Sequence, residues 1–497
     1  MIQALSPNAP RSHPDAPSRP FWHNGWIWAA MGLGVTLIGL RLLHGLIGND
    51  TFWQYATGQW ILAHHAIPYR DPFSWTVRGT PWVAQEWLWD VALAVVWHIG
   101  GLWGVTLFIW APAWIMWPVM MATYRRAGGR TPWVLLPLTA GSAFYLAIFW
   151  PARPEGATYL MFALLLYCLV RARQGESRWA WLLVPLTWVW ANFHASFLLA
   201  PIFVAIEVAL ASWSAQWGRV VNTAWPPSAR RTLWWVLGAM LLAGAATPHG
   251  IAFYDYAWRM STHNTMRNVI TEWFSPNFHL FVYCVLFVLA SGLLLWTWLT
   301  STPLPLWWII YTGGLIYGFL DSQRWLPYLC VALPLLVASL PMSWTPHIRL
   351  SMGKGLVLGA GLLAVVAVQW PANSVAISVR QGGEPIGAVN YYVAHAHGAR
   401  IFNQYAWGDY LIYRHIPVYI DGRADLYTQT PIWNAYLAVT GLTRNPAGYF
   451  AHQQIHWVLI APHTPLAYWL ATQSSWRLVY HSSQSTLWEL TRGGRPA

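Results

Sequence analysis

Long apolar segments separated by short polar stretches occupy most of the first 370 residues. A membrane-spanning helix needs about 20 consecutive, mostly apolar residues to cross the hydrocarbon core of a bilayer. Eleven segments approach this length, and the shorter ones need a few flanking residues to complete a crossing. They lie at residues 26–48, 102–124, 132–150, 156–171, 179–193, 195–212, 232–247, 279–299, 303–320, 325–342 and 354–370. The pattern predicts an α-helical polytopic membrane bundle of about eleven crossings.

The composition supports a membrane protein over a soluble one. Hydrophobic residues make up 56% of the chain and charged residues only 9%, whereas about a quarter of the residues in an average soluble domain are charged. The net charge of +12 is spread over short clusters, so we expect no nucleic-acid partner. The three cysteines lie in apolar segments, which disfavours a disulfide framework.

The positively charged clusters between the apolar segments predict the orientation, because membrane loops rich in Arg and Lys stay in the cytoplasm. This rule gives a cytoplasmic tail at residues 1–25, with no cleavage pattern, ahead of a membrane domain at 26–370. The clusters are Arg11 and Arg19; Arg125, Arg126 and Arg130; Arg171, Arg173 and Arg178; Arg219, Arg230 and Arg231; Arg349 and Lys354.

An external loop at residues 48–101 follows the first crossing. Within it, residues 86–99 are apolar enough for a further crossing, which would reverse the orientation of everything after them. Glu86 and Asp90 are four residues apart and share one helical face, so we interpret this stretch as an amphipathic helix lying in the outer interface.

The composition becomes polar after residue 370. Short strand-like runs alternate with helix-like segments, which is typical of a small α/β domain. Eleven crossings from a cytoplasmic start place this predicted domain, residues 371–497, outside the cytoplasm. The strand-like runs are 400–402, 417–420, 457–460, 477–481 and 486–490, and the helix-like segments include 386–396 and 431–440.

The rare polar residues near helix ends fall on the same, extracytoplasmic side in this topology. A charge in or beside a membrane is costly, so such residues indicate a functional site. We therefore expect an active or binding cavity that opens outward. The candidates are Asp50, Asp71, Glu86, Arg153, Glu155, Asn192, His194, His249, Glu272, Asp321 and Arg324.

Asp50 is the first candidate for catalysis. A carboxylate at the rim of a dry cavity has a raised pKa and can take a proton from an incoming hydroxyl or amide. The alternative is that Asp50 caps the helix that begins at Thr51, an ordinary use of aspartate. The sequence does not choose between these two roles.

Arg153 and Arg324 are rare cations at outer helix ends. Their guanidinium groups match phosphate geometry, so they suit a lipid phosphate or pyrophosphate. Structural ion pairs with Glu155 and Asp321, or snorkelling, are equally open. His194 and His249 follow no zinc-binding spacing, and no metal site is indicated, although a divalent ion is not excluded. Walker, dinucleotide-binding and nucleophile-elbow motifs are absent from the sequence, which disfavours soluble nucleotides as substrates.

Three short stretches of the external loop, at residues 50–61, 67–74 and 82–88, resemble the first external loop of GT-C-type integral-membrane glycosyltransferases, in particular an uncharacterised bacterial branch. Further landmarks of that branch match along most of the chain. They are Arg153-Pro154, Asn192-x-His194, Pro248-His249-Gly250, Glu272-Trp273-x-Ser275-Pro276, Arg324, Trp407-Gly408-Asp409-Tyr410-Leu411 and Asp421-Gly422-Arg423-Ala424-Asp425.

This resemblance implies a sugar donor carried on a polyprenyl phosphate or pyrophosphate in a bacterial inner membrane, and an inverting transfer to an acceptor on the outer face. Asp50 matches the family's acidic residue of the first external loop, with Asp71, Glu86 and Glu272 as supporting acids. The donor-phosphate contacts of the family correspond to Arg153 and Arg324. The oligosaccharyltransferase acceptor motif is similar to residues 407–410, but its second tryptophan and its glycine are missing here.

Two other classes stay open. A membrane protein that handles lipid or haem without catalysis would also combine many tryptophans, 40 here, with external histidines. The tight tryptophan-rich segment and flanking axial histidines of such haem proteins are missing. A transporter would carry broken helices in two similar halves, which the sequence does not show.

Overall fold

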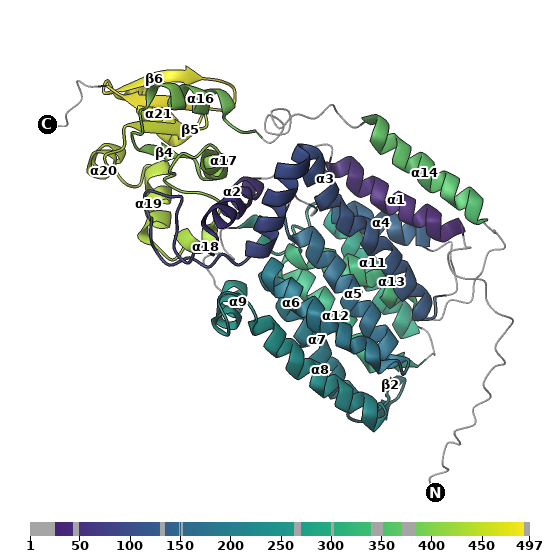
Figure 1. The fold of residues 1–497 in the computed structure, drawn as a ribbon. Coiled ribbons are helices and arrows are strands. Elements are labelled where there is room, and N and C mark those ends of the chain that lie inside the picture. The colour runs from purple at the N-terminus through teal and green to yellow at the C-terminus, as the bar shows by residue number, and fades with distance from the viewer. Residues whose placement is uncertain are drawn as a thin grey trace, which may run out of the picture.

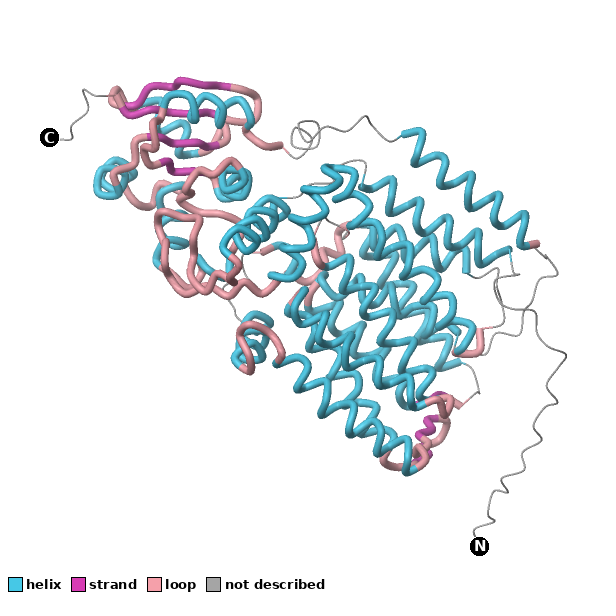
Figure 2. Tube along the Cα trace, viewed as in Figure 1, coloured by secondary structure: helices cyan, strands magenta, loops and turns pink. Residues whose placement is uncertain are grey.

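The computed structural model describes residues 25–42, 49–129, 135–148, 150, 153–262, 270–299, 303–338, 351–369 and 383–491. A bundle of helices forms the larger part, and a smaller region with most of the strands follows at the C-terminus (Figures 1 and 2). The predicted tail up to residue 24, Gly48 and residues 370–382 lie outside the described residues.

Helices account for most of the described residues of the predicted membrane domain. The α-helices are α1 (Gly25–Leu42), α2 (Asn49–His64), α3 (Trp87–Arg126), α4 (Leu135–Ile148), α5 (Glu155–Arg173), α6 (Leu183–Phe193), α7 (Leu199–Ala211), α8 (Pro227–Ala245), α9 (Ala252–Thr262), α11 (Phe281–Leu299), α12 (Leu306–Asp321), α13 (Leu326–Ala338) and α14 (Met352–Gln369). The 3₁₀ turns are η3 (Ser177–Leu182), η4 (Ala195–Leu198), η5 (Thr271–Trp273) and η6 (Gln323–Trp325).

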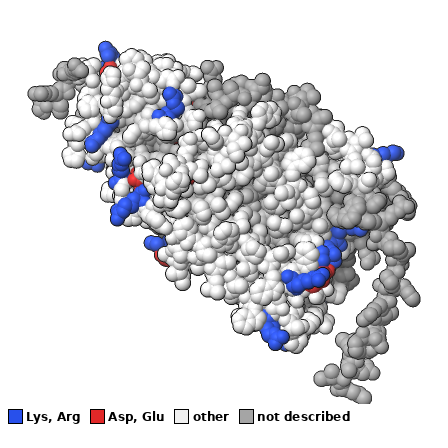
Figure 3. Space-filling view, viewed as in Figure 1, with Lys and Arg blue, Asp and Glu red and all other residues white. Residues whose placement is uncertain are grey.

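Each of the eleven predicted apolar segments contains one of these helices or part of one. Among the described residues, two helices are both long and apolar enough to cross a membrane, Trp87–Arg126 and Glu155–Arg173. Eleven crossings and their orientation therefore stay predictions. One face of the molecule in Figure 3 shows charged side chains mainly toward its two ends, with an almost uncharged middle.

Helix α3 joins the stretch that we expected in the interface to the next apolar segment. Gly101 separates them with non-helical dihedral angles, φ 54° and ψ −142°, a conformation that glycine adopts without a steric cost. The interfacial placement of residues 86–99 stays a prediction, but their acidic face is buried within the protein. Glu86 and Asp90 are 6% and 0% exposed, because this face turns toward α2, which packs on α3.

The bundle is built from neighbouring helix pairs. Helix α1 packs against α4 and α14, α3 against α5, and α6 against α8. Glu207 of α7, whose partner the sequence does not reveal, forms a buried ion pair with Arg173 of α5. The Tyr311 hydroxyl of α12 also donates to Glu207, so three helices share one buried carboxylate.

A small sheet lies at the base of α8. Its strands are β1 (Ala215–Trp217), β2 (Val220–Asn222) and β3 (Leu304–Pro305), with β2 in the centre. The β1–β2 pair is antiparallel and the β2–β3 pair is parallel.

The C-terminal region forms a four-stranded sheet in the order β4-β5-β7-β6. Strand β4 runs parallel to β5, and β7 is antiparallel to both β5 and β6. The strands are β4 (Ile401–Asn403), β5 (Trp457–Ile460), β6 (Trp476–His481) and β7 (Thr486–Leu490). The helices are α16 (Ile386–His395), α17 (Gly408–Tyr413), α18 (Ala424–Tyr427), α19 (Pro431–Thr440), α20 (Pro446–Gln453) and α21 (Pro465–Thr472), with the 3₁₀ turn η7 (Tyr405–Trp407).

Four of the five strand-like runs coincide with these strands, and the fifth prediction is wrong. Residues 417–420 form only an isolated bridge, between Val418 and Ser74 of the external loop. The run is apolar and β-branched like a strand, but it pairs with a loop that is distant in the sequence. A local pattern cannot reveal such a partner.

The external loop binds the C-terminal region through several hydrogen bonds. The Trp75 backbone N–H donates to Val418 at 3.0 Å, its indole donates to the Ile401 carbonyl at 3.1 Å, and the Thr76 hydroxyl donates to the Tyr419 carbonyl at 2.7 Å. Helix α17 also packs on α2. The C-terminal region is therefore fastened to the segment that carries Asp50.

The α2–α3 contact depends on Gly58. A methyl group there would lie 2.0 Å from the Asp90 carbonyl oxygen and 2.8 Å from the Ala94 side chain. We predict that Gly58→Ala lowers the free energy of unfolding by about 1–3 kcal/mol, the usual effect of overpacking.

The matched control is Gly238→Ala in α8, where a methyl group meets no atom within 4 Å. Alanine favours a helix over glycine, so this variant should unfold at the wild-type temperature or above. Thermal unfolding in detergent, followed by tryptophan fluorescence, measures both. Equal midpoints for the two variants would contradict the tight α2–α3 contact.

Candidate functional site

Seven charged or titratable side chains from separate loops and helix ends meet beside the start of α2. We call them the ionic cluster. Its members are Asp50, Glu86, Arg153, Glu155, His194, Glu272 and Arg324. All seven are candidates from the sequence, and the structure brings them together from stretches more than 270 residues apart.

Asp50 lies in the first turn of α2, where the helix dipole favours a negative charge. Its Oδ2 forms an ion pair with Arg153 Nε at 2.7 Å, and its Oδ1 accepts from the Trp53 indole at 3.3 Å. Burial raises the pKa of Asp50, while the Arg153 charge opposes this rise. The carboxylate stays partly open, with 23% of its side chain exposed, as a base that must reach a substrate requires.

Glu272 bridges the two arginines. One of its oxygens pairs with Arg153 Nη1 at 3.1 Å, and the other accepts from Arg324 Nη2 at 3.0 Å and Nε at 3.2 Å. Burial works against the Glu272 carboxylate, but Arg324 and Arg153 together lower its pKa. Arg324 also lies 3.5 Å from Glu155. The two guanidinium groups are thus held side by side by shared acids.

Local sequence explains how these groups are presented. Arg153 precedes Pro154, and a residue before proline is kept out of the helical region, so α5 begins only at Glu155. Ser322 accepts from the Arg324 backbone N–H at 3.4 Å and donates to the Glu272 carbonyl at 3.2 Å. The serine therefore joins η5 to η6 and keeps Glu272 opposite Arg324.

Glu86 and His194 form the inner edge of the cluster. Glu86 accepts from the Gln54 amide at 2.6 Å, and burial, followed by the charges of Glu155 and Asp50, raises its pKa well above the usual range. Burial and the nearby arginines lower the pKa of His194 to about 3. His194 Nδ1 accepts from the Ser196 backbone at 3.1 Å, so the neutral ring carries its proton on Nε2, toward Glu86 at 3.9 Å.

Tryptophan indoles surround the cluster and account for part of the tryptophan excess. Trp53 donates to Asp50 at 3.3 Å and Trp89 donates to Gln54 at 3.2 Å. Trp190 donates to Ser196 at 3.0 Å. An indole fills space with apolar atoms and still offers one N–H donor, which suits a polar site enclosed by a bundle of apolar helices.

The remaining candidates make contacts with other groups. Asn192 accepts from the Trp87 indole at 2.8 Å and donates to the Trp188 and Ala246 carbonyls, so its amide links α6 to α3 and α8. His249 stacks edge-on with Tyr69 at 5.3 Å. The Asp321 carbonyl, at the end of α12, accepts from the Ser275 hydroxyl at 3.2 Å. None of these contacts joins the ionic cluster.

Asp71 belongs to a second, fully buried network with the C-terminal region. It forms an ion pair with Arg423 at 2.7 Å and accepts from the backbone N–H groups of Phe73 and Ser74 at 3.1 Å. Arg423 also binds Asp421 through two hydrogen bonds, at 2.8 and 2.7 Å. The side chains of Asp71, Asp421 and Arg423 are 0% exposed, so Asp71 fixes the loop and is closed to solvent.

Sequence reasoning did not nominate Gln54 or Asp409 for the site. Gln54 binds Glu86, as described above, and Asp409 lies against Asp50 across Gly422. The motifs Trp407-Gly408-Asp409-Tyr410 and Asp421-Gly422-Arg423 were the available signal. Each places a glycine next to an acid, but neither indicates which side chain it faces.

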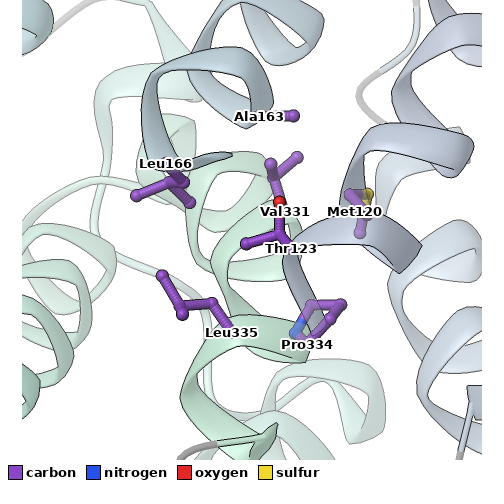
Figure 4. Close-up of a pocket in the computed structure, with 7 residues that line it drawn as sticks. All are labelled: Met120, Thr123, Ala163, Leu166, Val331, Pro334 and Leu335. Carbon is purple, nitrogen blue, oxygen red and sulfur yellow. The ribbon is translucent and has the colours of Figure 1, made fainter. Parts of the chain in front are cut away.

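Other features give no competing site. Among the described residues, no three His, Cys, Asp or Glu side chains are grouped as metal ligands would be. A small hollow between α3, α5 and α13 is lined by apolar residues and Thr123 and has no room for a water molecule (Figure 4). It offers no charged group for binding a substrate.

Solved structures with a similar fold provide the comparison. An Archaeoglobus fulgidus oligosaccharyltransferase, AglB, in complex with an inhibitory peptide and a dolichol-phosphate, superposes with a TM-score of 0.54 at 10% identity, covering 89% of this chain and 69% of that one. Its apo form gives 0.52 at 10% identity, over 89% and 70%. This chain has the GT-C fold.

A weaker likeness extends to ArnT from Cupriavidus metallidurans bound to undecaprenyl phosphate, with a TM-score of 0.49 at 13% identity, covering 95% of this chain and 99% of that one. No family model and no curated protein matches the sequence. The predicted GT-C resemblance is confirmed for the fold by the two Archaeoglobus fulgidus structures.

The geometry separates Asp71 from Asp50 in a way that stability measurements can test. Removing one partner of a buried ion pair leaves an uncompensated charge and costs about 3–5 kcal/mol. We predict a loss of this size for Asp71→Asn, measured as the free energy of unfolding of the detergent-solubilised protein.

Asp255→Asn is the matched control, because Asp255 pairs with Arg259 on the exposed face of α9, where both side chains are more than 60% exposed. A surface pair contributes about 0–1 kcal/mol. If Asp71→Asn were as stable as this control, the buried Asp71–Arg423 pair would not hold the loop in place.

Proposed function

We propose that this protein is a glycosyltransferase of the bacterial inner membrane. It moves a sugar from a polyprenyl-phosphate-linked donor to an acceptor on the extracytoplasmic face, with inversion at the anomeric carbon. The observation that carries the proposal is the continuous chain Asp50–Arg153–Glu272–Arg324 at the loop end of a GT-C fold.

Asp50 has the properties of a general base. Its pKa is raised by burial, which makes the carboxylate a stronger proton acceptor, while Arg153 favours its ionised form. In the transfer, the acceptor loses its proton to Asp50 as its nucleophilic atom bonds to the anomeric carbon. The bond from that carbon to the phosphate oxygen breaks, and the lipid phosphate leaves with the electron pair.

Arg153 and Arg324 are the proposed partners of the departing phosphate. Fixed guanidinium groups stabilise a charge that develops during a reaction without having to reorganise. Glu272 holds both guanidinium groups and keeps 38% of its own side chain exposed. A donor phosphate can therefore approach from the Glu272 side and share the arginine donors with that carboxylate.

The fold comparison supports the donor class. The AglB structure contains a dolichol-phosphate, and the fold of this chain is similar to that of AglB. We extend the polyprenyl-phosphate class to this protein on that basis and on the paired arginines. The sugar and the acceptor stay unspecified.

The first test replaces the proposed base. Asp50→Asn keeps the size of the side chain but cannot accept a proton, so we predict that sugar transfer falls by at least about 100-fold, the scale of general-base catalysis. Turnover is measured as release of free lipid phosphate from a panel of undecaprenyl-phosphate-linked sugars by the full-length protein in nanodiscs. Asp255→Asn should keep wild-type turnover, and full activity in Asp50→Asn would eliminate this residue as the base.

The second test separates donor binding from chemistry. Arg324→Gln removes a charged donor to phosphate, worth about 1.5–3 kcal/mol, so affinity for undecaprenyl phosphate should fall roughly 10- to 100-fold. Native mass spectrometry with added undecaprenyl phosphate measures the binding. Arg259→Gln on exposed α9 is the matched control, and Asp50→Asn should bind as the wild type does. Unchanged affinity in Arg324→Gln would contradict the phosphate-binding role.

A further inference from the structure

Asp409 is a buried acid that the proposed transfer does not use. It is 1% exposed and lies in the first turn of α17, in the C-terminal region. Its Oδ1 accepts from the Gly422 backbone N–H at 2.7 Å. Its Oδ2 has no hydrogen-bond partner among the described residues. A buried carboxylate oxygen without a partner is costly when it is charged.

Gly422 separates Asp409 from Asp50. A methyl group built on Gly422 would lie 2.6 Å from Asp409 Oδ2 and 2.8 Å from Asp50 Oδ1. The two oxygens therefore flank a space that would not hold one methyl group without a clash. The unpartnered oxygen of Asp409 is the one nearest to this methyl position, on which Asp50 Oδ1 also borders.

The charges around the two acids differ. Asp50 forms an ion pair with Arg153 at 2.7 Å, and the charges of Glu272 and Glu155 act on it more weakly. The strongest charges acting on Asp409 are all acidic, namely Asp50, Asp421 and Glu384. Arg423 forms ion pairs with Asp421 and Asp71, so its guanidinium group compensates those two acids. Among the charges that act most strongly on Asp409 there is no cation, whereas Asp50 is paired with Arg153.

We propose that Asp50 and Asp409 form a carboxylate pair across Gly422 that holds one proton, carried by Asp409. Two like charges this close in a buried setting cannot both ionise readily, and unequal surroundings decide which acid keeps the proton. Asp409 is then a positioning residue that acts through Asp50. In its neutral form it leaves Asp50 as the single anion of the pair, beside Arg153.

The fold holds the two acids in register. Phe52 of α2 contacts the rings of Tyr410 and Tyr413 of α17 at 5.4 and 5.1 Å, so the helices that carry Asp50 and Asp409 are joined by aromatic packing. Tyr405 donates to the Gly422 carbonyl at 3.3 Å. Gly408, next to Asp409, lets α17 approach the backbone at Ile420 closely, because a methyl group on Gly408 would lie 2.1 Å from the Ile420 carbonyl oxygen.

Burial and the charge of Asp50 also raise the pKa of Asp409 well above its ordinary value. A group whose folded-state pKa is raised stabilises the fold most below its unfolded value, near 4. It loses that contribution as the pH rises through the folded-state pKa. Loss of the proton from Asp409 therefore makes the fold less stable in alkali than it would be with a residue that stays neutral there.

Infrared spectroscopy tests the proton directly on the full-length protein and needs no substrate. At about pH 7, the wild-type spectrum minus that of Asp409→Asn should contain the C=O band of a protonated carboxyl group, and this band should disappear as the pH rises. The difference spectrum of the exposed control Asp255→Asn should contain ionised carboxylate bands instead. Absence of a protonated band in the Asp409→Asn difference spectrum overturns the proposal.

Stability gives a second readout. Asparagine mimics the size and the donor of the neutral acid, so the unfolding midpoint of Asp409→Asn should fall less than that of the wild type between about pH 5 and about pH 9. Equal pH dependence in the two proteins contradicts the proposal. If Asp409→Asn does not fold, Gly422→Ala replaces it. The added methyl group separates the carboxylates, so the pH midpoint of the acid band must change, and an unchanged midpoint overturns the pair.

The effect on transfer rests on the proposed function and is measured separately. We expect the turnover of the wild type to fall in alkali as Asp409 ionises, and the pH profile of Asp409→Asn to lack this alkaline limb. If the wild type transfers sugar but its turnover shows no alkaline limb, the proposed function stands and the carboxylate pair is ruled out. If the wild type shows the titrating acid band but transfers no sugar, the carboxylate pair stands and the proposed function is ruled out.

Discussion

The buried contact of Arg423 with Asp71 and Asp421 is the constraint on which the arrangement of the site depends. One guanidinium group is enclosed between two carboxylates, all three with no exposed side-chain surface. Desolvation makes such an arrangement costly unless every partner is present, so the external loop and the C-terminal region must come together as a unit. Since this loop follows α2 and Asp409 precedes Arg423 in the same region, the contact also determines which groups face Asp50.

The ionic cluster solves a similar problem by different means. Its acids outnumber its two arginines, and the structure compensates through sharing. Glu272 pairs with both arginines and Asp50 pairs with Arg153. Glu86 accepts a hydrogen bond from the Gln54 amide, and the pKa of Glu86 is raised. The cluster thus combines two positioned guanidinium groups with acids that differ in how closely they are paired with a cation. Stability and chemistry place opposite demands on these groups, and only the partly exposed ones are available to a substrate.

Much of the architecture could be predicted from the sequence because it depends on local periodicity. The apolar segments contain helices, α19 and four of the strands lie where the pattern put them, and the residues of the ionic cluster were candidates from their positions at helix ends. Long-range pairing could not be predicted in the same way. Residues 417–420 looked like a strand but pair with the external loop, and the spacing of Glu86 and Asp90 did not reveal that both are buried against α2. Asp409 was missed as a site residue because nothing near it in the sequence indicates that Gly422 brings it to Asp50.

The indole donors around the cluster have a consequence for how it responds to its surroundings. The carboxylates and His194 change their hydrogen-bonding capacity when they gain or lose a proton. The Trp53, Trp89 and Trp190 indoles donate in the same way at every physiological pH. The acidic and histidine side chains of the site can therefore change their charge with pH, whereas the indoles around them cannot. Acid or alkali can switch the charges at its core while the surrounding tryptophans hold Asp50, Gln54 and Ser196 in place.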